Sequence, residues 1–215
     1  SLVGSEMCIR DSMYSNGVDT MLQLGQVLLA LYITFYLYAF IIYGGMVKFF
    51  GKYNPIQFFK DIAPAGLNAF GTCSSSATIP ISLKCASEKI GIPEEITSLT
   101  LPLGATINMD AVSILMSFMI TFFATALGID LSIGTMVTVL ACNVLLSIGT
   151  PGVPGGAIAA FAALCPIAGI PTNQILGVYI SVNTLCDMGA TCVNVIGDLA
   201  CSTVLKQTLH FDKKK

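Results

Sequence analysis

Positive charge is absent from the middle of this sequence of 215 residues. No Lys, Arg or His occurs between Lys89 and Lys206, yet Asp110, Asp187 and Asp198 lie within that interval. All three acids fall in apolar stretches, where an unpaired carboxylate costs several kcal/mol or takes up a proton. We therefore expect the balancing positive charge to come from an inorganic cation, a proton, an ammonium-bearing substrate or another part of the parent protein.

Charged residues are few in the chain as a whole, and this excludes an ordinary soluble domain. They make up 10% of the sequence, against 54% hydrophobic residues, and the mean hydropathy is +0.81. Such a composition predicts an integral, all-α membrane protein. The net charge of -2 gives no reason to expect a nucleic-acid partner.

The cysteines and the histidine argue against two further kinds of site. The 8 cysteines form no C-x-x-C pair, so we interpret them as small buried hydrophobic residues rather than a disulfide framework or a zinc site. The single histidine, His210, lies in the charged tail. No base is therefore near the serines at 74–76, which argues against serine hydrolysis.

Three stretches are long and apolar enough to span a bilayer, which takes about 20 residues. They are residues 20–47, 98–128 and 173–208. The second stretch has polar or flexible residues at every second position from Gly104 to Asp110, a pattern that puts them on one side of an extended strip of backbone. We therefore predict a broken or unwound helix there, with exposed carbonyl groups.

Two further stretches predict re-entrant helical hairpins. Residues 55–92 form short arms around a hydroxyl-rich break from Thr72 to Pro80, and residues 131–170 form short arms around a Pro- and Gly-rich break from Gly149 to Gly156. These arms are marginal or short for a full span. Irregular backbone at membrane depth must line a cavity or be buried in protein.

The lysines predict the orientation of the chain. They all fall on one side of this arrangement, and the loops on the other side, near Asp130 and Pro171, contain none. The positive-inside rule then places the C-terminus, with its basic tail at 209–215, in the cytoplasm. Residues 1–12 do not resemble a signal peptide and look like a non-native scar, followed by a linker at 13–19.

The last span carries the most regular polar pattern. Its polar residues recur every three or four positions and therefore form one stripe on a helix: Asn183, Asp187, Thr191, Asn194 and Asp198. With two acids in it, this stripe predicts a wet or liganded face rather than a simple helix contact. Broken helices, opposed hairpins and acids near mid-depth are typical of secondary transporters.

Four motifs in order make the chain resemble the dicarboxylate/amino acid:cation symporter family, which includes glutamate/aspartate transporters and neutral amino acid exchangers. They are the serine-rich tip at 74–76, Asn108-Met109-Asp110, Gly152-Val153-Pro154-Gly155 and the stretch from Asp187 to Asp198. The resemblance implies an elevator mechanism, in which a transport domain slides against a trimeric scaffold in the plasma membrane. It also implies that this chain is a C-terminal transport-domain fragment of a homotrimeric parent, without the scaffold helices.

The same resemblance implies Na+ as the coupling ion, in about two to three sites with oxygen ligands that suit a hard cation. One ion would be held by carbonyls of Gly104, Asn108 and Asn194 and by the carboxylate of Asp198. A second would be enclosed by Thr106, Ser147, Ile148 and Thr150, with Met109 beside it. A third would use Asn108 and Asp110, with its remaining ligands upstream of this sequence.

The implied substrate is an amino acid lying between the hairpin tips, at Ser74, Ser75, Ser76 and Val153. Its ammonium group would bind Asp187, next to Thr191 and Asn194. Relatives that carry acidic substrates have an Arg at the position of Ala190, and often another at that of Cys73 or Met188. Neither arginine is present here, and Asp187 is thereby left freer for an ammonium group or a proton. We therefore predict a small neutral substrate such as alanine, serine, threonine or cysteine.

Three alternatives stay open at this point. The parent could transport acidic amino acids or dicarboxylates, or the chain could be a truncated fragment without activity. An intramembrane aspartyl protease, with two acids sharing a proton, is a remote third reading. It is disfavoured because Val195-Ile196-Gly197-Asp198 lacks the first glycine of the Gly-x-Gly-Asp motif, so we do not expect an enzyme.

Overall fold

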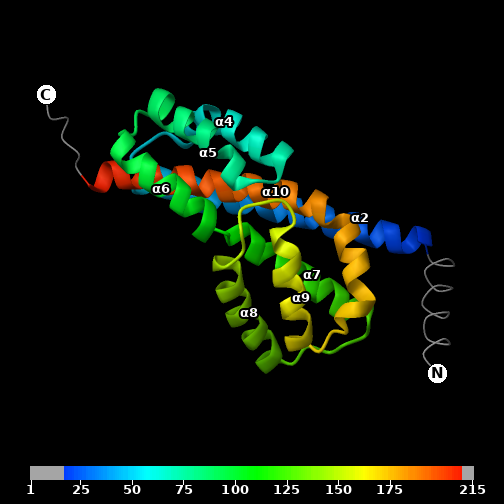
Figure 1. Cartoon of the computed structure of the whole chain (residues 1–215). Coiled ribbons are helices and arrows are strands. Elements are labelled where there is room, and N and C mark those ends of the chain that lie inside the picture. Colours follow the sequence, from blue (N-terminus) through cyan, green and yellow to red (C-terminus); the bar gives the residue numbers. More distant parts are fainter. Residues whose placement is uncertain (1–16, 210–215) are drawn as a thin grey trace, which may run out of the picture.

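The computed structural model describes residues 17–209, and the regular structure in that range is entirely helical (Figure 1). The all-α prediction is therefore confirmed for the described residues. The predicted scar at 1–12 and nearly all of the predicted tail at 209–215 lie outside them. In chain order the elements are α2 (Gly17–Tyr38), the π-helical turn η1 (Ala39–Tyr43), α3 (Gly44–Phe49), α4 (Pro55–Thr72), α5 (Ser75–Lys84), the π-helical turn η2 (Cys85–Ile90), α6 (Glu94–Ile107), α7 (Asp110–Ala126), α8 (Ile133–Ile148), α9 (Gly156–Ile167) and α10 (Thr172–Thr208).

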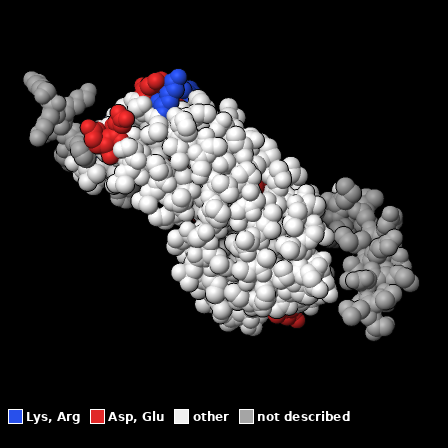
Figure 2. All heavy atoms as spheres, viewed as in Figure 1, with Lys and Arg blue, Asp and Glu red and all other residues white. Residues whose placement is uncertain are grey.

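Three parts of the structure are long and apolar enough to cross a membrane, as predicted. They are Leu22–Phe49 in α2, η1 and α3, Glu94–Ala126 in α6 and α7, and Thr172–Thr208 in α10. Figure 2 shows that charged side chains gather toward the two ends of the visible face, with an almost uncharged belt between them. Such a belt is the surface expected of a protein that faces lipid or other apolar helices.

Helix α10 is the centre of the structure, and all the other described helices except α8 pack against it (Figure 1). In its most apolar window 78% of the residues are buried, against 28% in the first span. A helix that is apolar or small on most of its faces is expected to be buried in this way. The polar stripe of α10 therefore faces protein rather than lipid.

The first hairpin consists of α4 and α5, and its break is shorter than predicted. Asn54 caps α4, and Cys73 ends it in the left-handed conformation with a φ of 50°. The Ser74 hydroxyl then accepts a hydrogen bond from the backbone N–H of Ala77 and starts α5. The expected break from Thr72 to Pro80 is wrong in extent, because this cap makes the chain helical again from Ser75.

The second hairpin consists of α8 and α9, joined by the Pro- and Gly-rich tip at 149–155. The Ser132 side chain caps α8, and Gly155, with a φ of 78°, leads into α9. The helices have 16 and 12 residues, which is below the length that spans a bilayer. The re-entrant course of both hairpins stays a prediction.

The break between α6 and α7 is also narrower than the sequence pattern suggested. Gly104 and Thr106 are helical, and the N–H of Asn108 still bonds to the carbonyl of Gly104 at 2.8 Å. The backbone leaves the helical conformation at Asn108 and Met109 alone, before α7 starts at Asp110. The expectation of an extended strip from Gly104 was wrong, because helical hydrogen bonding continues to the residue before the break.

Candidate functional site

The polar stripe of α10 lies inside the protein. Its five members are each at most 6% exposed: Asn183, Asp187, Thr191, Asn194 and Asp198. Buried polar groups need hydrogen-bond partners. Asp187, Asn194 and Asp198 have partners in the break between α6 and α7, in α7 itself and in the tip of the second hairpin, so α10 joins these elements into one site. Asn183 Oδ1 has no hydrogen-bond partner among the described residues.

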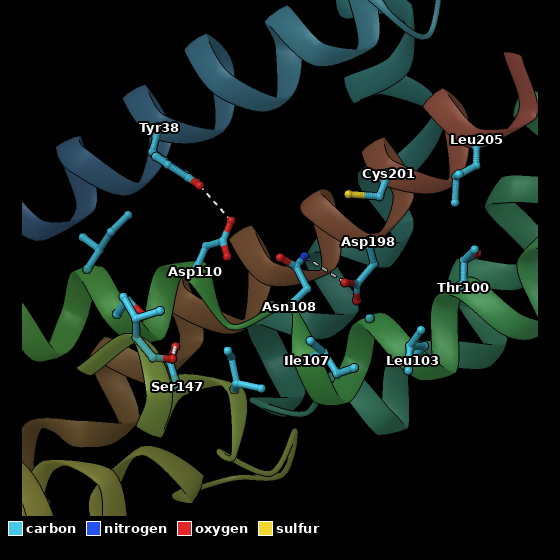
Figure 3. A pocket seen from close by; sticks show the side chains of 15 residues that line it. Tyr38, Thr100, Leu103, Ile107, Asn108, Asp110, Ser147, Asp198, Cys201 and Leu205 are labelled. Atoms are coloured by element: carbon cyan, nitrogen blue, oxygen red, sulfur yellow. Dashed lines mark hydrogen bonds between the residues drawn. The ribbon is translucent and has the colours of Figure 1, made fainter. Parts of the chain in front are cut away.

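Asp198 forms the centre of the first predicted cation cluster (Figure 3). The Asn108 side-chain amide donates to Asp198 Oδ1 at 2.9 Å and to the carbonyl of Asn194 at 3.1 Å. Gly104 lies against the same carboxylate so closely that an added Cβ would collide with Asp198 Oδ1. All four predicted ligand residues of this site are therefore brought together.

The residues of this cluster fit a sodium ion in kind. They offer one carboxylate and several carbonyl oxygens, which are the ligands that hard cations prefer. Gly104 also lies in the last turn of α6, where the carbonyl groups of a helix carry partial negative charge. The Asn108 amide donates to two of the expected ligands, so an ion bound there would have to replace these hydrogen bonds.

Asp110 has partners that the sequence analysis missed. The hydroxyl groups of Tyr38 and Tyr43 both donate to Asp110 Oδ2, at 2.7 and 2.8 Å. Their spacing of five residues does not place two side chains on one face of an α-helix, which is why the pattern gave no signal. The first span thus provides two hydrogen-bond donors to Asp110, the acid whose cation site was expected to need further ligands from upstream of this sequence.

The second predicted cation set is divided between two cavities. Ser147 and Ile148 line a cavity of about 660 Å³, together with Asn108, Asp110 and Asp198 (Figure 3). Met109 and Thr150 line a separate, much smaller cavity. Thr106 is exposed, and its hydroxyl donates to the carbonyl of Leu103. The residues of this set therefore line two different cavities, and Thr106 lines neither of them.

The smaller cavity contains most of the residues predicted to bind substrate. Ser75, Val153, Asp187, Thr191 and Asn194 line it, and its volume is about 10 Å³. This space holds roughly one water molecule and no amino acid. The described conformation is therefore a closed one.

Contacts between the two hairpin tips close this cavity. The carbonyl of Gly152 accepts hydrogen bonds from the Ser74 hydroxyl at 3.0 Å and from the N–H of Ser76 at 3.2 Å. These two serines bind the opposite tip rather than line the cavity. Ala190 is fully buried and does not line it either. The serines therefore hold the tips together, and Ala190 lies outside the closed cavity.

Asp187 is less free than the sequence suggested. Its Oδ2 accepts from the N–H of Gly155 at 3.1 Å, and its Oδ1 accepts from the Thr191 hydroxyl at 3.3 Å. Gly155 precedes the N-terminus of α9, where a negative charge is favoured. The missing arginine is thus replaced by two uncharged donors, and one of them belongs to the second hairpin tip.

Asn194 connects the small cavity to the helix break. Its Oδ1 accepts from the N–H of Ala111 at 3.0 Å, and its Nδ2 donates to Met109 Sδ at 3.2 Å. The first bond satisfies one of the free N–H groups at the start of α7, as an N-cap side chain does. Asn194 therefore fixes the start of α7 between the cation cluster and the small cavity.

Comparisons with known proteins give the family and several relatives of this chain. A sequence model of the sodium:dicarboxylate symporter family matches residues 7–208. Neutral amino acid transporter A of Homo sapiens is 34% identical over 179 residues, which cover 81% of this chain and 33% of that protein. Excitatory amino acid transporter 2 of Homo sapiens is 36% identical over 145 residues, covering 67% of this chain and 25% of that protein.

A third relative comes from a nematode. The putative sodium-dependent excitatory amino acid transporter glt-4 of Caenorhabditis elegans is 34% identical over 171 residues, which cover 80% of this chain and 34% of that protein. The chain thus spans about a third or less of the length of these relatives. All three are named as transporters, which sets aside the enzymatic alternative.

Proposed function

Because this chain belongs to the sodium:dicarboxylate symporter family, we propose that it is the transport domain of a sodium-coupled symporter for small neutral amino acids. The family implies amino acid transport and sodium coupling. The matched relatives include both neutral and excitatory amino acid transporters, so the substrate class has to be argued from the site.

One observation supports a neutral rather than an acidic amino acid as the substrate. Asp187 is the single ionisable carboxylate among the residues that line the small cavity, and no Lys or Arg is among these described residues. An acidic substrate would bury a side-chain carboxylate in addition to the α-carboxylate that every amino acid carries, and this second carboxylate would need a cationic or multiply hydrogen-bonding partner. At Ala190, where acidic-substrate relatives are expected to carry Arg, the side chain is a methyl group outside the closed cavity and adds no cationic partner.

The proposed binding step uses the hydrogen bonds around Asp187. An incoming ammonium group competes with the N–H of Gly155 for Asp187 Oδ2, and the second hairpin tip moves away to admit the substrate. Thr191 keeps Oδ1 in place during this exchange. When the tips meet again through Ser74, Ser76 and Gly152, water is excluded from the bound amino acid.

The buried acids indicate that a bound sodium ion would contribute positive charge to the site. Bound Na+ would balance the negative charge of Asp198 and Asp110 during passage through the membrane. Gly104, Asn108, Asn194 and Asp198 would hold one ion. We propose about two to three sites in all, on the donor chemistry of these residues and of the second set around Thr150.

The remaining architecture is also part of the proposal. The two hairpins are re-entrant, and the domain moves as an elevator within a homotrimeric parent in the plasma membrane, with its C-terminus in the cytoplasm. The short helices α8 and α9 and the one-sided distribution of lysines support this arrangement.

Uptake by the full-length parent tests the proposal. We would reconstitute it into liposomes and measure uptake of labelled serine, alanine and glutamate with and without an inward sodium gradient. Sodium-driven uptake of serine and alanine, with little uptake of glutamate, is the expected result. Strong glutamate uptake by the unaltered protein would overturn the neutral assignment.

A further inference from the structure

Two tyrosines of the first span hold the carboxylate at the start of α7. Tyr38 and Tyr43 donate to the same oxygen, Asp110 Oδ2, at 2.7 and 2.8 Å, and their rings meet edge to face with centroids 5.3 Å apart. Figure 3 shows Tyr38 reaching across to Asp110 from the first span. The carboxylate is therefore fixed from one side by two uncharged donors.

The π-helical turn η1 makes this double contact possible. In a regular α-helix two residues five positions apart differ in direction by about 140°. The turn η1 begins directly after Tyr38 and ends at Tyr43, and its wider i to i+5 hydrogen bonding brings both side chains to one face. Such turns are less regular than the α-helix and often occur at functional sites.

The tyrosines also lie directly beside the cation cluster. A Cβ added to Gly197 would lie 2.5 Å from both the Tyr43 hydroxyl and Asn108 Nδ2. Tyr43 therefore packs against the same turn of α10 as the amide that bonds to Asp198. The hydrogen bonds of both tyrosines go to Oδ2, and among the described residues none goes to Asp110 Oδ1.

We propose that Tyr38 and Tyr43 are positioning residues that fix Asp110 for a cation, by holding Oδ2 so that Oδ1 is left to the ion. This inference rests on the proposed sodium coupling and extends it to the first span. Phenol groups suit this purpose, because they stabilise a carboxylate by hydrogen bonding without neutralising its charge. A lysine in their place would satisfy the acid and remove the need for the ion.

Sodium-dependent substrate binding by the full-length protein tests this proposal. We would purify Tyr38→Phe, Tyr43→Phe and the double variant, and titrate sodium against serine binding at equilibrium. Each single variant is expected to raise the half-saturating sodium concentration roughly tenfold, as for loss of a hydrogen bond to a charged group. Serine affinity at saturating sodium should change by less than about twofold. Tyr36→Phe is the matched control, because it removes a phenol from α2 that does not bond to Asp110.

A double-mutant cycle separates positioning from general packing. In an Asp110→Ala background, Tyr43→Phe is expected to cause no further change in sodium dependence. An unchanged sodium dependence in the Tyr38→Phe/Tyr43→Phe variant would overturn the proposal, and so would an equal shift in the Tyr36→Phe control. Serine binding by the unaltered protein that ignores sodium would instead contradict the proposed sodium coupling itself.

Discussion

Each of the three acids that lie in the apolar stretches accepts hydrogen bonds from uncharged donors. Asp110 accepts from two tyrosines, Asp187 from a backbone N–H and a threonine, and Asp198 from the amide of Asn108. These donors lower the cost of burying a carboxylate and leave its charge in place. Acids with uncharged donors keep a negative charge that a cation or an ammonium group can balance, which is what the proposed transport of sodium and amino acids requires.

Ala190 is the residue at which substrate class can be tested. We predict that Ala190→Arg raises the ratio of glutamate to serine uptake by roughly tenfold or more, because a guanidinium group can bind a carboxylate through two hydrogen bonds. Ala190 is fully buried, so the larger side chain must find room as the second hairpin tip opens. Competitive uptake of the two labelled amino acids measures the ratio.

Ala190→Gln is the control for side-chain size, because glutamine is long and polar but uncharged. It should lower serine uptake without raising glutamate uptake. If the Arg and Gln variants gave the same substrate preference, charge at this position would not decide selectivity.

At the scale of elements, the site depends on how closely α6 and α10 approach. We predict that Gly104→Ala raises the half-saturating sodium concentration roughly tenfold, because the added Cβ collides with Asp198 Oδ1 and overpacking costs about 1–3 kcal/mol. Sodium titration of substrate binding measures this shift. Gly177→Ala on α10 is the control, since nothing lies within 4 Å of its added Cβ. Equal sodium dependence in both variants would argue against the cluster at Asp198.

The contact between the second hairpin tip and the end of α6 gives another test. We predict that Gly152→Ala weakens substrate binding roughly tenfold at saturating sodium, because its Cβ collides with the carbonyl of Ala105 and keeps the tip from closing. Equilibrium binding of labelled serine measures the loss. Gly149→Ala, in the same tip, has its nearest contact at 3.7 Å and should bind serine normally. Normal binding by Gly152→Ala would mean that tip closure does not depend on this contact.

The sequence predicted the kinds of elements better than their limits. Polar residues every three or four positions predicted the stripe of α10, because a long regular helix has one simple period. The breaks were placed too broadly, since a single cap at Ser74 and one continued hydrogen bond at Asn108 decide where helix resumes or ends. The tyrosine pair on η1 could not be predicted, because a π-helical turn changes the period locally.

At the scale of the whole molecule, the described part of the chain is a set of helices around one buried helix that carries a polar stripe. The three predicted spans are present, and the cation cluster and the small cavity lie on neighbouring turns of α10. Asn194 belongs to both, through its carbonyl and its side chain. Because of this shared residue, a cation bound on one side is expected to order the start of α7 and with it the substrate cavity. Composition could predict that the chain lies in a membrane. The link between the cation cluster and the substrate cavity could not be predicted in this way, because it depends on contacts between residues far apart in the sequence.

Paired flux through the full-length protein tests the central claim most directly. Labelled sodium and labelled serine would be followed in the same liposomes, for the unaltered protein and for Asp198→Asn, with Asp130→Asn in the exposed loop as the control. The account predicts that serine enters together with about two to three sodium ions and that Asp198→Asn uncouples or abolishes both fluxes while Asp130→Asn does not. Serine uptake that follows a proton gradient and carries no sodium would contradict it.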